Sequence, residues 1–545
     1  MAFQTVNFKT DADRNLMQRL ALKEIRWADI SGMDRAIMDG NGNSVRSSLL
    51  KMEVNRLNGT ELMDQIVPAL VEICLRVNLP DLALRLVFPH LKANSNFQQI
   101  DEGLKYALGT SLIQIGDTRW GRRILQTVDT NLYPKSLLFL GISYFTEWNG
   151  QLAFHHLSQY VHSEKLKEYD RMIGNLNLAS ASFAIKNYDL TEHCLSSLIP
   201  WSKETNRFYL HGSCLEMQGQ LLLQKKEFGP AKKCFTTALE TIKSVDSLPY
   251  LWSEKWMAVA ELMSGSKDFS QIQKIKEKSI RLKDYETLRE CDLFIGHFSQ
   301  DPQLIKRVYF GSSYRGYRSR ISELVSKDLL EEALQDPVVP ISPKFDIGYG
   351  KPAEKTPNDT LSDTLELFSG SFQNSHKNFE FASQNHQLVF ACASDLYRPF
   401  SIAGIFSLLF SEEYYNPYVS PQRVHQAKSR LKRWALENKV DLSLDFQFGS
   451  YKLNSDSVSV KFEQPITIGE TNDLILEKLK KTFPRGEFSA KEASLLFGLS
   501  ARGTTRILKQ YCDRGFLDKL GSARTISYLI KEQAEEKNEL GNIAS

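Results

Sequence analysis

A loose repeat of small and apolar residues runs from about residue 62 to residue 278, and it constrains the fold of this chain more than any other feature. The repeat is clearest in residues 215–242, where Gly219, Ala231, Phe235 and Ala238 recur at fixed offsets. The first position of each copy recurs at intervals of 38, 32, 38 and 40 residues, at Val71, Gly109, Gly141, Ala179 and Gly219. Small residues at such positions let two antiparallel helices cross closely, and each helix pair then buries its apolar side against the next pair. The pattern therefore predicts an α-solenoid.

The four positions in residues 215–242 resemble the tetratricopeptide (TPR) pattern of a glycine, an alanine, an aromatic residue and a second alanine. The resemblance implies a TPR-like repeat domain over residues 61–334. Repeats of this kind usually bind a protein, a peptide or a small ligand on their concave surface. The sequence leaves open which of these partners the chain takes.

A basic helix followed by a hairpin is expected in residues 420–453. The apolar positions fall on one helical face, at Val424, Ala427, Leu431, Trp434 and Ala435. Ser420 is expected to cap the helix and Pro421 to occupy its first position. From residue 421 to residue 434 there are five cations and no acid. Two short alternating runs follow, so the order of elements is that of a winged helix.

This stretch resembles the DNA-binding domain of OmpR/PhoB-type response regulators. Residues 424–433, VHQAKSRLKR, resemble the recognition helix of that family, and residues 449–453, GSYKL, resemble the end of its wing. The resemblance extends upstream to residue 365, through two strand-like runs (365–368 and 379–381) and helices near 388–395 and 402–410. It implies a winged helix over residues 361–455 that binds duplex DNA. The wing departs from the family because it lacks the usual arginine-rich tip.

The resemblance assigns roles to side chains that would face DNA. Base edges are expected to meet Gln422, Gln426, Ser429 and Arg433, because glutamine suits adenine and arginine suits guanine. Phosphates are expected to meet Arg423, Arg430 and Lys432, and the wing would touch the backbone through Tyr451 or Lys452. The loop of residues 414–418 before the helix is where such domains contact partners such as RNA polymerase; the alternative is an aromatic plug for a small core.

A second winged helix is predicted over residues 470–530, from helices, a turn at 498–500, a third helix at 501–513 and a hairpin. The third helix is expected to bury Thr504, Leu508 and Tyr511. Its opposite face carries the candidate DNA contacts Arg502, Arg506 and Lys509, and the hairpin adds Arg524. The alternative for these cations is a solvated helical face.

The remaining segments complete the predicted domain organisation. Residues 1–60 form an N-terminal helical segment of unassigned role, residues 335–360 are rich in Pro and Gly and form a linker, and residues 531–545 form a flexible tail. The fold class is thus mainly α, a TPR-like α-solenoid followed by two winged-helix (α+β) domains. Residues 309–320, with three tyrosines and three arginines, suit nucleic-acid stacking or phosphate binding, or else a packed loop.

Composition excludes several classes of protein. The seven cysteines stand singly with no CxxC pair, which argues against structural zinc or a disulfide framework and favours a reducing cytoplasm. No run of about eighteen apolar residues occurs, so no membrane span is expected. Phosphate-loop, metalloprotease, serine-hydrolase and Rossmann motifs are missing, and we expect no enzyme activity, no metal and no cofactor. His155, His156 and His162 share no spacing with an acid or cysteine and are expected to be packed or solvated.

Two hypotheses of function follow. The first is a transcription regulator in which the solenoid binds a partner or effector and one or both winged helices bind duplex DNA; a homodimer is a further expectation. The second is an assembly scaffold of the PCI-like kind, in which helical repeats end in a winged helix that packs against other proteins. The basic helix favours the first hypothesis.

Overall fold

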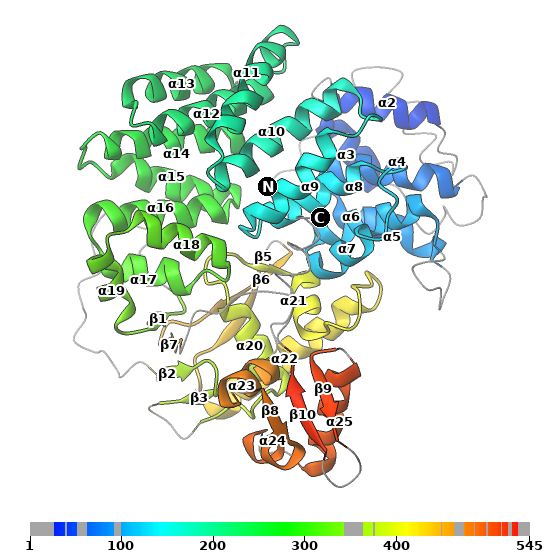
Figure 1. Cartoon of the computed structure of the whole chain (residues 1–545), viewed down its shortest axis with the longest axis vertical. Coiled ribbons are helices and arrows are strands. Elements are labelled where there is room, and N and C mark those ends of the chain that lie inside the picture. The colour runs from blue at the N-terminus through cyan, green and yellow to red at the C-terminus, as the bar shows by residue number, and fades with distance from the viewer. Residues whose placement is uncertain are drawn as a thin grey trace.

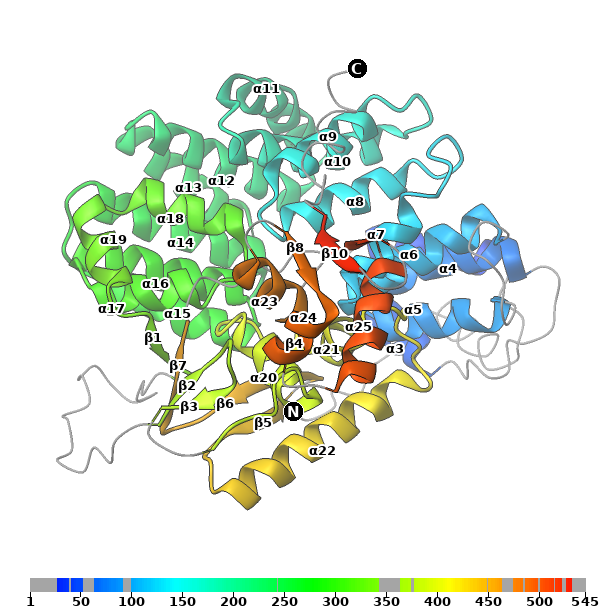
Figure 2. The same cartoon turned by 60° about the horizontal axis from the view of Figure 1, so that its bottom comes forward.

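The computed structural model of the chain describes residues 27–38, 41–51, 63–91, 100–242, 244–342, 363–373, 377–447, 449–462, 474–483, 486–497, 500–513, 515–521 and 526–531. In this part of the chain, helices form an arc, and two small modules containing sheets follow it (Figures 1 and 2). Arg524, most of the predicted linker and the predicted tail apart from Lys531 lie outside the described residues.

Antiparallel helix pairs build the arc, and each pair packs against the next. Its helices are α2 (Trp27–Met38), α3 (Gly42–Leu50), α4 (Met63–Arg76), α5 (Pro80–Val87), α6 (Glu102–Ile115), α7 (Thr118–Leu125), α8 (Lys135–Phe145), α9 (Gly150–Val161), α10 (Glu168–Ala184), α11 (Tyr188–Glu204), α12 (Phe208–Gln224), α13 (Phe228–Thr241), α14 (Leu248–Met263), α15 (Ser270–Leu282), α16 (Tyr285–Ser299), α17 (Pro302–Phe310), α18 (Arg315–Leu324) and α19 (Lys327–Leu334). The predicted helical-repeat arm is therefore confirmed, and α2 and α3 extend it toward the N-terminus.

The small residues of the repeat lie where paired helices cross. A Cβ atom added at Gly141 would lie 2.5 Å from Leu157 Cγ, and one at Gly109 would lie 2.7 Å from Leu125 Cδ2. The glycine of the clearest copy, Gly219, packs in the same way against the ring of Phe235. In each copy the glycine contacts the residue 16 positions later, which is the position of Phe235 in the clearest copy. The repeat pattern therefore marks the places where the two helices of a pair cross.

The first module follows the arc and contains two sheets. The first sheet has the order β1-β7-β2-β3, with β7 parallel to β2 and the other pairs antiparallel. The second has the order β4-β6-β5 and is antiparallel. The elements are β1 (Val338–Pro340), β2 (Asp363–Glu366), β3 (Ser371–Phe372), α20 (Gln384–Ala393), β4 (Phe400–Ser401), α21 (Ile402–Leu409), α22 (Ser420–Asn438), β5 (Ser443–Gln447), β6 (Ser450–Asn454) and β7 (Val458–Lys461).

Several of these bounds differ from the expectations. Strand β1 lies inside the predicted linker, because it completes the sheet of the first module by pairing with β7. Residues 379–381 form no strand; Phe379 instead packs on Trp434 of α22, with ring centroids 4.0 Å apart. Helix α22 begins one residue earlier than expected, and Ser420 Oγ accepts the Asn416 N–H at 2.9 Å rather than capping the helix.

The first module is packed into the arc at both ends. Near the N-terminal helices, Ser401 Oγ donates to the carbonyl of Ile115 at 2.6 Å, and Trp120 Nε1 donates to the carbonyl of Ser411 at 3.1 Å. Near the C-terminal helices, Phe310 stacks on Phe462 with centroids 5.4 Å apart. One continuous hydrophobic core accordingly includes residues from α2 to α6 and most of the buried residues of the module.

The second module is smaller and has a core of its own. It consists of α23 (Leu474–Thr482), β8 (Glu487–Ser489), α24 (Ala490–Phe497), α25 (Ala501–Asp513), β9 (Leu517–Leu520) and β10 (Ser527–Ile530), with the antiparallel sheet order β8-β10-β9. It contacts the first module through Phe381, whose ring is parallel to Phe497 and lies 3.6 Å from Lys478 Nζ.

None of the helices in the described ranges has the length and apolarity needed to cross a lipid bilayer.

Candidate nucleic-acid interface

Helix α22 is the outermost helix of the first module (Figure 2). Its apolar positions Val424, Ala427, Leu431 and Ala435 are buried in the core of the module, as the helical spacing requires. Trp434 is partly buried and stacks on Phe372 as well as Phe379. This packing fixes which face of α22 looks outward.

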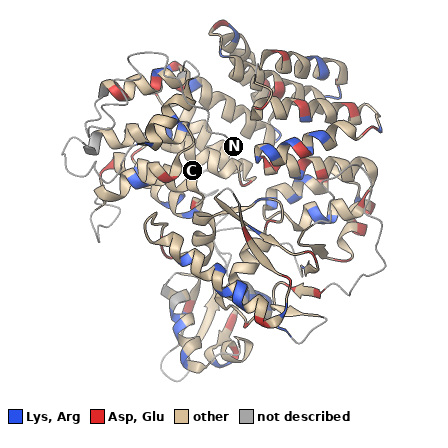
Figure 3. Cartoon of the chain, turned by 180° about the vertical axis from the view of Figure 1, so that it is seen from behind, with Lys and Arg blue, Asp and Glu red and all other residues tan. Residues whose placement is uncertain are grey.

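The outward face of α22 carries the predicted base-reading residues. Gln422, Gln426, Ser429 and Arg433 are all exposed, and they follow one another at helical spacings of four, three and four residues. Arg430 and Lys432 beside them are exposed as well. Blue residues accordingly mark the length of this helix in Figure 3. The structure thus brings six of the predicted residues together on one accessible helix face.

Two of the cations next to this face are held by other side chains. Arg423 is half-buried, forms an ion pair with Glu413 at 2.6 Å and lies 3.8 Å above the ring of Phe410. Arg430 donates to Gln384 Oε1 in α20. Both contacts orient a guanidinium at the edge of the helix face, where a phosphate would lie if the helix entered a major groove.

Tyr451 is placed differently from the expectation. It is 1% exposed, and its hydroxyl lies 2.5 Å from Nδ1 of His425. Its ring also faces Phe446 at 4.7 Å. Tyr451 therefore joins the hairpin to α22, and the predicted contact with a DNA backbone is wrong because the side chain points into the module.

Lys452 lies on the opposite side of strand β6 from Tyr451, since successive residues of a strand alternate. Its surroundings include Arg307 of the arm and Asp395. Desolvation, followed by the charge of Arg307, lowers the pKa of Lys452. Lys452 is exposed, so its predicted contact with a DNA backbone stays a prediction.

The hairpin adds little positive charge to the interface. Gln447 pairs with Ser450 across the turn, and Gly449 has a φ of +85°, which favours glycine. Asp445 is the charged residue of β5, and its Oδ2 accepts from Asn454 at 3.0 Å. Contact with DNA would therefore rest on α22.

In the second module, α25 buries Thr504, Leu508 and Tyr511 as expected. Arg502, Arg506 and Lys509 are exposed along the other face. This places three cations on one helix surface, but each of them is also compatible with a solvated face.

Two aromatic segments that the sequence singled out are packed inside the protein. Tyr317 is fully buried and Tyr314 nearly so, and Arg320 forms an ion pair with Glu290. The loop before α22 packs on the arm, where Tyr414 contacts Phe88 and Trp120. Residues 309–320 are thus largely packed, as the alternative expected, but they form the end of α17 and the start of α18 rather than a loop. Part of the 414–418 loop is taken up by contacts with the arm.

His155, His156 and His162 do not converge on a metal site. His156 stacks on Tyr144, and burial lowers its pKa to about 4. His162 Nδ1 contacts the carbonyl of Ser158 at 2.7 Å. No group of three or more His, Cys, Asp or Glu residues in the described ranges is arranged to hold a metal ion.

Lys428 and His425 also lie on α22, and neither is among the predicted DNA contacts. Lys428 Nζ lies 5.2 Å above the ring of Tyr451, and His425 contacts the hydroxyl of the same residue. Both support the hairpin from the helix. The pairing of a helix histidine with a strand tyrosine has no local signature, because the two residues are 26 positions apart.

Comparisons with known proteins give little further information. No family model matches the chain, and no curated protein does either. Among solved structures, the chain is similar to the one described as "Crystal Structure of Rap Protein Complexed with Competence and Sporulation Factor", with 10% sequence identity and a TM-score of 0.40, over 59% of this chain and 89% of that one.

Proposed function

We propose that this chain is a DNA-binding transcription regulator whose first module is a winged helix. The observation that carries the proposal is the exposed face of α22, on which Gln422, Gln426, Ser429 and Arg433 form a stripe free of the rest of the protein. The helix has no acid between residues 421 and 434. An α-helix of this kind fits the major groove of duplex DNA.

In this proposal the residues divide into two roles. Arg433 would pair with a guanine, and Gln422 and Gln426 would pair with adenines. Arg423, Arg430 and Lys432 flank the stripe and would hold phosphates, which fix the register of the helix on the duplex. The hairpin would follow the helix without supplying strong contacts, because it presents Asp445 rather than arginines.

The other parts of the chain receive supporting roles. The helical arm would bind a protein or peptide partner, and the second module would add phosphate contacts through Arg502, Arg506 and Lys509. These assignments are supported by the exposure of the three cations and by the size of the arm. Contact with RNA polymerase through Tyr418, which is 48% exposed, remains part of the proposal.

The test is binding of the full chain to duplex DNA over a range of salt concentrations. Arg430→Ala removes one phosphate contact and should lower the slope of log K against log salt by about 0.9. Arg433→Ala removes a base contact and should cost about 1–3 kcal/mol on the preferred sequence. Wild type should retard random duplex DNA at low salt, and the two changes together should abolish that retardation.

A matched control removes two cations elsewhere. Arg281 and Lys327 are 68% and 86% exposed, and both lie on the arm. Their replacement by alanine changes the net charge by the same amount and should leave DNA binding unchanged. Equal binding by wild type and by Arg430→Ala with Arg433→Ala would instead favour the assembly scaffold, in which the first module packs against other proteins.

A further inference from the structure

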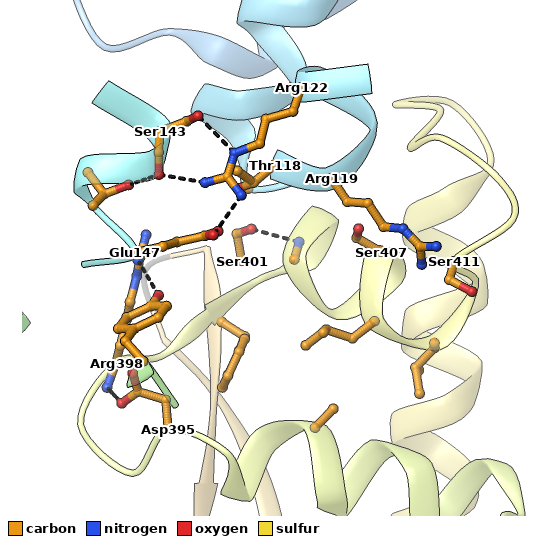
Figure 4. Close-up of a pocket in the computed structure, with 18 of the residues that line it drawn as sticks. Thr118, Arg119, Arg122, Ser143, Glu147, Asp395, Arg398, Ser401, Ser407 and Ser411 are labelled. Atoms are coloured by element: carbon orange, nitrogen blue, oxygen red, sulfur yellow. Dashed lines mark hydrogen bonds and ion pairs between the residues drawn. The ribbon is translucent and has the colours of Figure 1, made fainter. Parts of the chain in front are cut away.

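A cavity of about 1530 Å³ lies where the arm meets both C-terminal modules. The arm contributes the ends of α6 to α9 and the start of α18, and the first module contributes residues from Asp395 to Ser411. The second module closes it with side chains from α23, α24 and α25. In the close-up, Arg119 and Arg122 of α7 lie across from Ser401, Ser407 and Ser411 of the first module (Figure 4).

Cationic groups outnumber acidic groups in this cavity. Among the described residues that line it, the cationic ones are Arg119, Arg122, Lys283, Arg315 and Arg398, and the acidic ones are Glu147, Glu380 and Asp395. Glu147 accepts from Arg122 Nη1 at 2.7 Å, and Asp395 accepts from Arg289, which is not part of the lining, at 2.5 Å. The surplus of positive charge favours an anionic ligand.

Arg122 of the cavity is held in a fixed position by its contacts with Glu147, Ser143 and Tyr144. Arg122 also donates to Ser143 Oγ at 2.9 Å and to the Ser143 carbonyl at 2.6 Å, and its guanidinium lies 4.0 Å above the ring of Tyr144. Arg398 Nη1 lies 3.5 Å from the hydroxyl of Tyr314. A guanidinium group fixed like that of Arg122 can receive a carboxylate without losing much side-chain entropy.

Apolar side chains from all three parts complete the lining. They include Ile142 of the arm, Phe390 and Leu408 of the first module, and Ile475 and Phe497 of the second. The volume exceeds the roughly 300–1,000 Å³ of typical sites for drug-sized molecules. A ligand that fills this space has an extended apolar body as well as an anionic group.

We propose that the cavity binds an amphipathic carboxylate, with the carboxylate at the arginines and the apolar body against the two C-terminal modules. Such a ligand would touch the arm and both modules at once. Ser450, at the start of strand β6 next to α22, belongs to the same lining. On the proposed function, occupancy would therefore change DNA affinity, because the ligand affects how the modules sit on the arm.

The test uses anilinonaphthalene sulfonate, a fluorescent probe with an apolar ring system and one oxyanion, titrated into the full chain without DNA. The double variant Arg315→Gln with Arg398→Gln should weaken probe binding roughly tenfold, as expected for lost charge-assisted hydrogen bonds. The matched variant Arg281→Gln with Lys327→Gln changes two cations outside the lining and should bind the probe like wild type. Equal thermal midpoints for the two variants show that both fold.

Competition then identifies the source of the carboxylate. Displacement by a leucine-rich hexapeptide with a free carboxyl terminus, but not by its amidated form, assigns a peptide ligand. Displacement by octanoate assigns an acyl ligand. Equal probe affinity in the two double variants, or displacement by neither carboxylate, overturns the proposal. A chain that binds the carboxylate but no DNA would reject the proposed function and leave the cavity site intact.

Discussion

Arg289 shows how single charged residues join the arm to the first module. It is fully buried in α16, and its Nη2 donates to Asp395 Oδ2 of the first module at 2.5 Å, with Ser312 Oγ 3.0 Å from Nη1. Burial alone would lower the pKa of Arg289, but the charge of Asp395 raises it. The arginine therefore stays charged, and it depends on its partner.

Replacement of that partner should be strongly destabilising. Asp395→Asn keeps an oxygen for the backbone N–H groups of Tyr397 and Arg398. It removes the nearer of the two carboxylates that compensate Arg289, the other being Glu286 at 3.7 Å. We expect the free energy of unfolding, measured by urea denaturation, to fall by about 3–5 kcal/mol. Asp246→Asn is the control, because the Asp246–Arg281 pair is exposed and should contribute less than about 1 kcal/mol. A similar loss for both variants would contradict the prediction.

Asp117 makes the same junction sensitive to pH. Its Oδ2 accepts the Tyr415 N–H at 2.8 Å, and burial raises the pKa of its carboxyl from 3.8 to about 6. The folded state thus binds a proton more tightly than the unfolded state does. This group contributes stability that is fully present below pH 4 and is lost as pH rises through about 6.

The variant Asp117→Asn should remove that dependence. A shift of two pKa units corresponds to about 3 kcal/mol, so the variant should gain up to about that much stability relative to wild type between pH 4 and pH 7. Urea denaturation of both proteins at the two pH values measures the difference. A difference that stays constant with pH would mean that Asp117 has an ordinary pKa.

These residues could not have been identified from the sequence. Arg289 and Asp395 are 106 positions apart, and Asp117 and Tyr415 are 298 positions apart, so no local pattern relates them. Tyr451 was misassigned for a similar reason: its neighbours in sequence belong to an exposed hairpin, whereas its contacts come from α22. The exposed residues of α22 could be predicted from the sequence, because helical periodicity alone indicates which side of this helix is buried.

At the scale of elements, the close crossing of paired helices explains why small residues recur in the repeat. The Gly141→Ala change places a Cβ 2.5 Å from Leu157 Cγ, so the two helices α8 and α9 must separate or Leu157 must move. Overpacking of this kind costs about 1–3 kcal/mol. The measurement is the thermal midpoint of the variant, which should fall.

Gly229→Ala is the matched control for this change. Gly229 also lies in a helix of the arm, α13, but nothing lies within 4 Å of a Cβ built there. Alanine is the better helix former by up to about 1 kcal/mol, so this variant should be as stable as wild type or more stable. If Gly141→Ala were equally harmless, the crossing positions would not need to be small.

The helices of the arm and α22 could be predicted because each has a strong local signal in small residues or in helical spacing. Strand β1 could not. Its residues, Val338 to Pro340, lie among prolines and look like a linker, and they form a strand only because β7, more than a hundred residues later, offers an edge to pair with. Short strands of this kind depend on tertiary partners rather than on their own sequence.

At the scale of the molecule, the arm and the first module form one folded unit, whereas the sequence suggested separate domains. Phe462 of the module stacks on Phe310 of the arm, and one hydrophobic core joins buried residues of α2 to α7 and Phe310 to most buried residues of the first module, with Leu474 of α23 at its edge. The second module differs, since it has its own core and meets the first mainly around Phe381. We therefore expect the arm and the first module to unfold together, and the second module to unfold separately.

Truncation tests the division. A chain that ends at residue 463 removes the second module and should keep its helical circular dichroism and a single cooperative thermal transition. Residues 336–463 alone should not fold, because Phe462, Tyr397 and Asp395 would lose the helices that cover them, and buried groups without partners cost stability. A folded 336–463 fragment, or an unfolded chain ending at 463, would contradict the single unit. A folded fragment would also mean that α22 does not need the arm to keep its position, although its buried face belongs to the core that the arm shares.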